Sequence, residues 1–374
     1  MSAYFAVGCY SRPPRATKSQ ENGLFIVKLD LETGSLKMLS KYNEVQNISF
    51  FSKFKDHLFA VTENEQSILH RFKIRYFEAR STEANGGIER TPVLELEHSF
   101  KFDVAGACFI STNEVKNEDG VNVAVACYDD GAIKLFKSDE NGLKEISNGL
   151  KLKDCVDPNS DRQEAPHAHC ILPWKGKSDT YALVDLGADR IYQIKATSDS
   201  LKIDESKTFE APPRSGPRHL IFHPSRPLAF LITELSNELL ILSTENEKLS
   251  ILNKYPLIGY PESTVNFPKS EIQNAAHISL SKNGKYILCS NRGNINDIIV
   301  FKLDEEKAAT AEFLQAFSTG EFPRYFEIID DRFLIILNQK SHTLVVYNFK
   351  NGGQIDSAPL CEMPLESPIA IFQL

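Results

Sequence analysis

The amino-acid sequence predicts an all-β fold, a seven-bladed propeller with four-stranded blades, on the strength of three observations. Short apolar runs occur in pairs joined by a turn, and the pair recurs at a period of about 50 residues. Most runs are β-branched or aromatic, and helical patterns are scarce. Where the repeat is clearest, two further runs follow the pair, and four strands per unit is typical of a propeller blade. The repeat spans nearly the whole chain, which predicts a single domain over residues 1–374.

The blades are counted by their second strands. The clearest pair is 217–224 with 228–234, which read PRHLIFHP and LAFLITE. Second strands are expected at residues 58–63, 121–128, 181–185, 228–234, 286–292 and 333–339. We expect the seventh blade to combine residues 368–372 as its first strand with residues 3–8 as its second. Sharing one blade between the two chain ends would close the ring and remove a free sheet edge.

Four polar stretches interrupt the repeat. Residues 78–92 and 113–120 are rich in Gly, Asn and Glu, so we expect outer loops there. Residues 255–273 contain three prolines, and residues 151–165 lead directly into a strand. We interpret all four as solvated connectors, although either of the last two could fold over one face and cover a central cleft.

The net charge of −8 argues against a nucleic acid or an anionic membrane as partner, because both favour a basic surface. It leaves room for a small anionic substrate, since a few arginines can set the field of a cleft. Arg12, Arg15 and Lys18 form a small basic loop that could grip an anionic group, although we interpret it as solvated surface.

The expected location is the cytoplasm. The first residues lack a basic segment followed by a long apolar one, and no apolar run approaches the length of a membrane span. The seven cysteines are odd in number and lack CxxC spacing, which favours reduced thiols over disulfides or a metal site. We expect a monomer or a weak homo-oligomer.

Polar residues at strand ends are predicted to meet on one rim of the ring. The first residue of a strand and the last residue of its antiparallel partner lie at the same end of a sheet. Arg218 opens one strand and Glu234 closes the next, so both should face the same mouth. The same argument places five further residues around that mouth: Glu63, His167, Arg292, Arg324 and Gln339.

The rim would be rich in arginine, and like charges repel unless an anion lies among them. Glu63 and Glu234 could supply that charge, or a bound carboxylate or phosphate could, because guanidinium suits both. A neutral His167 beside Arg218 and Glu234 is the expected acid or base.

A metal site is the less favoured interpretation. His167 and His169 are separated by one residue and would point the same way on a strand, so they could ligate zinc with His219 or His277. The neighbouring arginines oppose a cation, however, and we predict no metal. The chain also contains no GxSxG, P-loop or GxGxxG motif in a strand–helix setting, so we predict no other cofactor.

The strand-end segments of the repeats, taken together, resemble the propeller lactonase family. That family includes propeller-type 6-phosphogluconolactonases and fungal carboxy-cis,cis-muconate cyclases. The resemblance covers most of the chain and is strongest from about residue 165 to 350. It is carried by residues 166–169, 185–191, 216–224, 233–237, 274–276, 290–293, 323–326 and 338–341. It implies a seven-bladed propeller with its site in the central cleft.

The resemblance also implies site residues. The site proposed for the muconate cyclases falls on His167, Arg218, Glu234 and Arg292, which we take as catalytic. The residues that we expect to bind substrate are Glu63, His169, Arg324, Asn338 and Gln339.

The expected function is hydrolysis of 6-phosphogluconolactone to 6-phosphogluconate. In this hypothesis His167 or Glu234 takes the proton from water, Arg218 and Arg292 stabilise the oxyanion, and Arg324 holds the phosphate or carboxylate. The alternatives are a cycloisomerase that forms a lactone from an unsaturated polycarboxylate, and a propeller that only binds a partner. The carboxylates and amides of the expected rim favour the sugar lactone.

Overall fold

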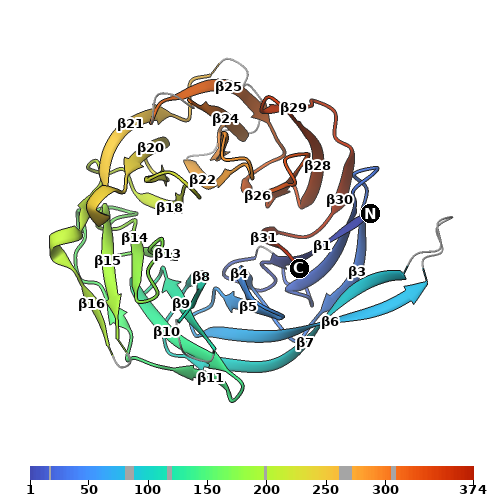
Figure 1. Ribbon diagram of the computed structural model, residues 1–374, viewed down its shortest axis with the longest axis horizontal. Coiled ribbons are helices and arrows are strands. Elements are labelled where there is room, and N and C mark those ends of the chain that lie inside the picture. Colours follow the sequence, from blue (N-terminus) through green and yellow to red (C-terminus); the bar gives the residue numbers. More distant parts are fainter. Residues whose placement is uncertain (17, 81–87, 116–119, 198–199, 261–271, 305–308) are drawn as a thin grey trace.

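The computed structural model describes residues 1–374 except residues 17, 81–87, 116–119, 198–199, 261–271 and 305–308. In this part of the chain, seven antiparallel sheets stand around a central axis and form a closed ring (Figure 1). Each sheet has four main strands, and three of them carry one additional short strand. The predicted seven-bladed propeller with four-stranded blades is confirmed.

The blades are numbered along the chain, with the innermost strand given first. Blade 1 consists of β31 (Pro368–Gln373), β1 (Ser2–Cys9), β2 (Leu24–Asp30) and β3 (Leu36–Tyr42). Blade 2 consists of β4 (Ile48–Phe54), β5 (His57–Thr62), β6 (Ser67–Arg80) and β7 (Ile88–Phe102). Blade 3 consists of β8 (Ala107–Glu114), β9 (Val121–Cys127), β10 (Ala132–Asp139), β11 (Gly142–Glu145) and β12 (Leu150–Lys151).

Blades 4 to 7 repeat this order. Blade 4 consists of β13 (Ala168–Pro173), β14 (Thr180–Asp185), β15 (Arg190–Ala196), β16 (Leu201–Ile203) and β17 (Phe209–Glu210). Blade 5 consists of β18 (Pro217–Phe222), β19 (Leu228–Thr233), β20 (Glu238–Ser243) and β21 (Ser250–Pro256). Blade 6 consists of β22 (Gln273–Leu280), β23 (Tyr286–Gly293), β24 (Asp297–Leu303) and β25 (Ala311–Ser318). Blade 7 consists of β26 (Pro323–Ile329), β27 (Phe333–Asn338), β28 (Thr343–Lys350), β29 (Gln354–Ile355) and β30 (Cys361–Pro364).

Helix is nearly absent from the described residues. Two short 3-10 turns are present, η1 (Glu205–Lys207) and η2 (Glu245–Glu247). Neither turn approaches the length or apolar character that crossing a bilayer requires, and the described residues hold no other helix that does.

The two chain ends pair in blade 1, as the sequence predicted. β31 lies innermost and runs antiparallel to β1, with Phe5 opposite Gln373 and Val7 opposite Ile371. The N- and C-terminal segments therefore lie side by side in one sheet (Figure 1). This pairing closes the ring by backbone hydrogen bonds.

The core lies between neighbouring blades and not at one centre. In β19, Leu231 packs in a cluster with Leu183 of blade 4, whereas the next residue, Ile232, packs with Ile287 of blade 6. Successive strand residues point to opposite faces, so each blade is apolar on both sides. Every residue of β19 is consequently buried, and the strand is a continuous apolar run.

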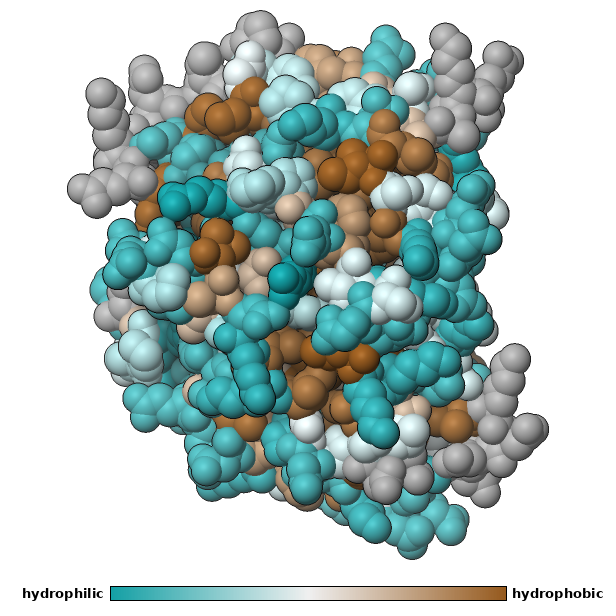
Figure 2. Space-filling model, turned by 90° about the vertical axis from the view of Figure 1, so that its left-hand side faces the viewer, coloured by the Kyte–Doolittle hydropathy of each residue, from teal (hydrophilic) through white to brown (hydrophobic). Residues whose placement is uncertain are grey.

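The outer surface of the ring is mainly hydrophilic. On the side of β15, β16 and β21, hydrophobic side chains are scattered among polar ones (Figure 2). Blade edges thus face water while the blade faces form the core.

The expected outer loop at residues 78–92 is wrong at its flanks. Residues 78–80 and 88–92 extend β6 and β7, which stay paired out to Arg80 opposite Ile88. This hairpin projects beyond the ring (Figure 1). Glu89 in its outer part accepts hydrogen bonds from Tyr4 and Lys28 of blade 1, whereas the apolar Phe77 and Ile88 are exposed. The sequence therefore lacks the apolar alternation that marks a half-buried strand.

The ends of two other expected connectors also belong to strands. Residues 113–114 end β8, residues 255–256 end β21 and residue 273 begins β22. The intervening residues 116–119 and 261–271 lie outside the described part of the chain. The connector 151–165 is fully described, and it reaches the functional site.

Candidate functional site

A β-bulge near the start of the innermost strand aims side chains at the axis. In blade 5, Pro217 pairs with Thr233 and His219 with Ile232, so Arg218 has no residue opposite it. Bulges re-aim a side chain and often lie beside active sites. The residues skipped in this way in blades 2, 3, 4, 5 and 7 are Ser49, Cys108, His169, Arg218 and Arg324.

A cavity of about 250 Å³ opens where these strands begin. Four of its lining side chains are arginines and two are glutamates, so its walls are net positive although the protein carries a net charge of −8. The lining residues are Arg15, Glu63, Cys108, Tyr128, Arg162, His169, Glu234, Arg292 and Arg324. We call this the arginine cavity.

Glu234 is the centre of one side of the arginine cavity. Its Oε2 accepts from Arg218 Nε at 2.8 Å and lies 3.1 Å from Arg292 Nη2. Its Oε1 accepts from Arg162 Nη2 at 2.7 Å. Burial opposes ionisation, but Arg292, Arg218 and Arg162 outweigh it and hold the pKa of Glu234 far below its ordinary value. Glu234 is therefore an anion that holds three guanidinium groups in place.

Glu63 is the centre of the other side. Tyr10 donates its hydroxyl to Glu63 Oε2 at 2.6 Å, Arg15 Nη1 lies 3.3 Å from Oε1, and Arg324 Nη2 lies 3.6 Å from Oε2. The interpretation of the basic loop as solvated surface is thus wrong for Arg15, which also pairs with Asp129. The loop follows β1, and β1 ends at this mouth.

Arg292 is buried and has one nitrogen without a described partner. Its side chain is 5% exposed, and its Nε has no hydrogen-bond partner among the described residues. Burial lowers the pKa of Arg292 to about 9 although Glu234 opposes this, and Arg218 and Arg324 lower it further. An anion bound in the cavity would accept a hydrogen bond from Arg292 Nε and would supply negative charge beside this guanidinium group.

Arg162 was not predicted. It comes from the connector 151–165 and donates to Glu234 and, at 3.2 Å, to the Tyr128 hydroxyl. Its neighbour Gln163 anchors the connector by donating to Asp189 Oδ1 at 2.8 Å. The one sign in the sequence that Arg162 could reach the site was the position of its connector, which leads directly into a strand that begins at the mouth.

The two rim histidines are separated by the bulge. His169 lines the arginine cavity with its Nε2 3.9 Å from Glu234 Oε2. His167 precedes β13, donates from Nδ1 to the Tyr128 carbonyl at 3.0 Å and stacks on the Tyr128 ring. Both rings lie against Tyr128, with ring centroids 4.2 Å away for His167 and 5.4 Å away for His169, but of the two only His169 lines the cavity.

The remaining predicted residues lie outside the cavity lining. Arg218 is buried behind Glu234 and donates to the carbonyl of Ala276. Asn338 is buried at the end of β27 and donates to Thr343 Oγ1 at 3.3 Å. Gln339 follows it and does not line the cavity either. Glu63, His169, Glu234, Arg292 and Arg324 are the predicted residues that the fold brings together.

A column of histidines fills the channel beneath the arginine cavity. His169 and His219 rings are 5.3 Å apart, and His219 Nδ1 lies 3.1 Å from His277 Nδ1. Burial, with the charge of Arg218 added, lowers the pKa of all three well below 6.5. Among the residues that the structure describes, no group of three His, Cys, Asp or Glu could hold a metal ion.

This column of histidines predicts that the folded protein loses stability at acidic pH. In the folded protein a histidine with a lowered pKa stays neutral, whereas the same histidine in the unfolded chain takes up a proton below about pH 6.5. The free energy of unfolding therefore has its full value above about pH 6.5 and decreases as the pH falls below it. We expect His277→Gln to reduce the slope of unfolding free energy against pH by up to ~1.4 kcal/mol per pH unit between pH 6 and 5. Urea unfolding at pH 7.5, 6 and 5 measures this, with exposed His98→Gln as control. Equal slopes in His277→Gln and wild type would contradict it.

The chain is similar to a known protein family and to several known proteins. The family described as "Lactonase, 7-bladed beta-propeller" matches residues 4–359. The chain is 24% identical over 367 residues to the 6-phosphogluconolactonase of Formosa agariphila, covering 93% of both chains. It is 24% identical over 353 residues to that of Bacillus subtilis, covering 92% of both. The solved structure of the periplasmic gluconolactonase of Pseudomonas aeruginosa superposes with a TM-score of 0.80 at 22% identity, over 100% of this chain and 99% of that one.

Proposed function

Because this chain belongs to the seven-bladed β-propeller lactonase family, we propose that it hydrolyses a sugar lactone, 6-phosphogluconolactone, in the arginine cavity. The observation that carries this proposal is the excess of positive charge around buried Arg292, which lacks a partner at Nε among the described residues. Two relatives named 6-phosphogluconolactonase support the choice of substrate. The product would be 6-phosphogluconate.

The proposed proton acceptor is His169. Glu234 is a poor base, because three guanidinium groups hold it ionised and occupy both of its oxygens. His167 lies outside the cavity lining. His169 is neutral, since burial lowers its pKa, and Glu234 3.9 Å away would stabilise the imidazolium that forms.

The proposed hydrolysis consists of attack by water followed by opening of the lactone ring. The oxygen of a water attacks the lactone carbonyl carbon while His169 takes the water proton. Arg292 and Arg162 face the developing oxyanion and stabilise it. When the ring carbon–oxygen bond breaks, His169 returns the proton to the leaving sugar oxygen.

The two arginine groups suit the two ends of the substrate. Arg162 and Arg292 gather around Glu234, whereas Arg15 and Arg324 gather around Glu63. We assign the second pair to the phosphate, because guanidinium binds phosphate through directed hydrogen bonds. Glu63 would accept from a sugar hydroxyl.

The direct test is the hydrolysis of freshly made 6-phosphogluconolactone, measured against its spontaneous opening. We expect acceleration, with a KM at least tenfold higher for unphosphorylated gluconolactone because the pair Arg15 and Arg324 would be empty. Equal KM values would contradict the phosphate assignment. No acceleration of either lactone would contradict the hydrolase.

A second candidate reaction is the closure of a lactone from an unsaturated polycarboxylate. The observation that favours it is the number of arginines, because Arg15 and Arg162 join Arg292 and Arg324 in the cavity lining. Several carboxylates would use more guanidinium groups than one phosphate. Carboxy-cis,cis-muconate assayed in parallel separates the two reactions, and inactivity toward both would favour a propeller that only binds a partner.

The cysteines support a location in the reducing cytoplasm. All seven are free thiols, and five of them are buried. Disulfides would be expected to form or persist in an oxidising compartment.

A further inference from the structure

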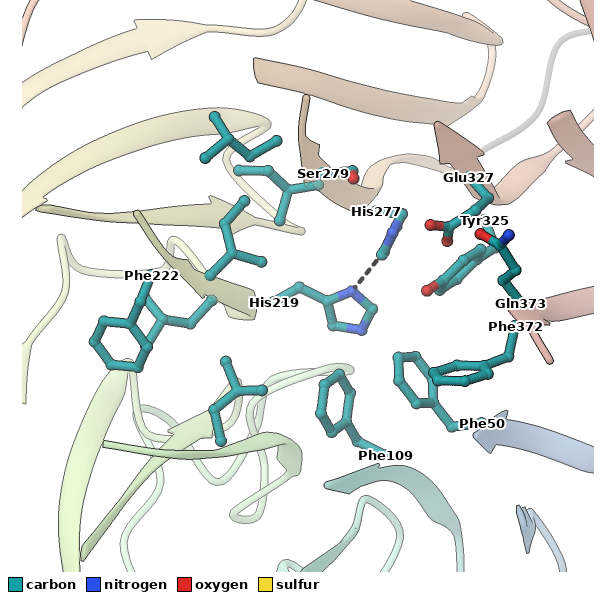
Figure 3. Close-up of a pocket in the computed structure, with 15 residues that line it drawn as sticks. Phe50, Phe109, His219, Phe222, His277, Ser279, Tyr325, Glu327, Phe372 and Gln373 are labelled. Atoms are coloured by element: carbon teal, nitrogen blue, oxygen red, sulfur yellow. Dashed lines mark hydrogen bonds between the residues drawn. The ribbon is translucent and has the colours of Figure 1, made fainter. Parts of the chain in front are cut away.

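A second cavity of about 410 Å³ lies at the opposite end of the channel. The innermost strands begin at the arginine cavity, and their later residues line this one. Figure 3 shows Phe50, Phe109, Phe372 and Tyr325 gathered beside His219, with Glu327 close to Tyr325. We call it the aromatic cavity.

The two cavities share no lining residue, although consecutive residues line them. Cys108 and Arg324 face the arginine cavity, whereas the next residues, Phe109 and Tyr325, face the aromatic cavity. Buried Arg218 and the histidine column separate the two. The reaction proposed above uses nothing in the aromatic cavity.

Glu327 is the unusual group in this cavity. It comes from β26, and no described residue donates a hydrogen bond to it or pairs with it as a cation. Neither lysine nor arginine is found among the lining residues. Burial alone raises the pKa of Glu327 to about 8, which reflects the missing partner.

The other groups around Glu327 do not compensate it. His219 and His277 line the same cavity, and burial lowers the pKa of each well below 6.5, so both are neutral. Tyr325 stacks on His277 with ring centroids 3.8 Å apart, and its own pKa is raised by burial and by Glu327. The described cavity therefore presents one carboxyl group, several aromatic faces and the neutral polar side chains of Ser279 and Gln373, and no positive charge.

We propose that the aromatic cavity binds a small organic cation, with the ammonium group at Glu327 and the apolar body against Phe50, Phe109 and Tyr325. Aromatic faces attract cations through their quadrupole, and a carboxylate supplies the full opposite charge. A concave, mostly apolar site with one charged group is typical of small-molecule binding. Once Glu327 is ionised, an anionic ligand would be repelled by the same charge.

The test uses benzyltrimethylammonium, whose charge does not depend on pH, and neutral benzyl alcohol. At pH 8.5 we expect the cation to bind at least tenfold more tightly by isothermal titration calorimetry. Because the ligand does not titrate, its affinity should rise between pH 6.5 and 8.5 as Glu327 ionises.

Glu327→Gln should abolish both the preference for the cation and its pH dependence, whereas exposed Glu312→Gln should keep both. Circular dichroism reports that the Glu327→Gln variant is folded, so the result does not depend on the proposed function. Equal affinity for the two ligands, tighter binding of the alcohol, or a cation preference that survives Glu327→Gln would each overturn the proposal.

Discussion

Replacing Glu234 by glutamine is expected to lower kcat/KM for the lactone by at least ~100-fold. The change removes the anion that Arg162, Arg218 and Arg292 share, and their charges then repel one another inside a buried site. The guanidinium groups that face the oxyanion would lose their alignment, and the loss of one such donor costs about 10²–10³-fold in other enzymes. Steady-state kinetics on freshly made lactone measures the effect.

The control is Glu238→Gln, on the next strand of the same blade. Glu238 pairs with Lys254 at 3.6 Å and does not line the arginine cavity. Circular dichroism of both variants separates a loss of fold from a loss of chemistry, because leaving buried charges unpaired also destabilises a protein. A folded Glu234→Gln variant with near-normal kcat/KM would remove Glu234 from the mechanism.

The second large effect separates His169 from His167. We expect His169→Gln to lower kcat by ~10²–10⁴-fold, the usual contribution of a positioned base, and His167→Gln to lower it less than tenfold. His169 lines the arginine cavity, whereas His167 stacks on Tyr128 and donates to its backbone. Each variant thus serves as the matched control of the other.

Two readouts refine this comparison. His169→Gln should change kcat with little change in KM if it removes a proton acceptor, whereas loss of a substrate contact would raise KM. The reverse order, with His167→Gln the more damaging change, would restore the role that the sequence suggested for His167 and contradict the role proposed here for His169.

The propeller could be predicted from the sequence because its signals are local and repeated. Each blade buries both faces, so strands such as β19 are apolar throughout, and turn residues mark their ends. The pairing of β31 with β1 followed from the count, since six complete units left two unpaired strands at the chain ends. The projecting hairpin of β6 and β7 was missed because its outer part meets blade 1 through the polar contacts of Glu89 with Tyr4 and Lys28, which leave no apolar pattern in the sequence.

The site could be predicted only in part. Strand order places Arg218, Glu234 and Arg292 at one mouth, and the structure joins all three in ion pairs. A bulge shifts the register of the innermost strands by one residue, and among the residues that it skips His169 lines the cavity whereas Arg218 does not. That shift brings His169 to the cavity, and strand periodicity does not reveal it.

Arg15 and Arg162 show the second limit. Both come from irregular segments, and each reaches a carboxylate on another blade, Glu63 and Glu234 respectively. No spacing along the chain encodes such a contact.

The blade count, the closure of the ring and the mouth at which the charged strand ends meet follow from the amino-acid sequence, because they depend on apolar patterns and antiparallel order. The three-dimensional arrangement was needed to show which polar groups line the cavity, which are buried behind it, and that Glu327 lacks a described partner at the other end of the channel. Charge balance and burial are set by neighbours from several blades, and these meet only after the ring has closed.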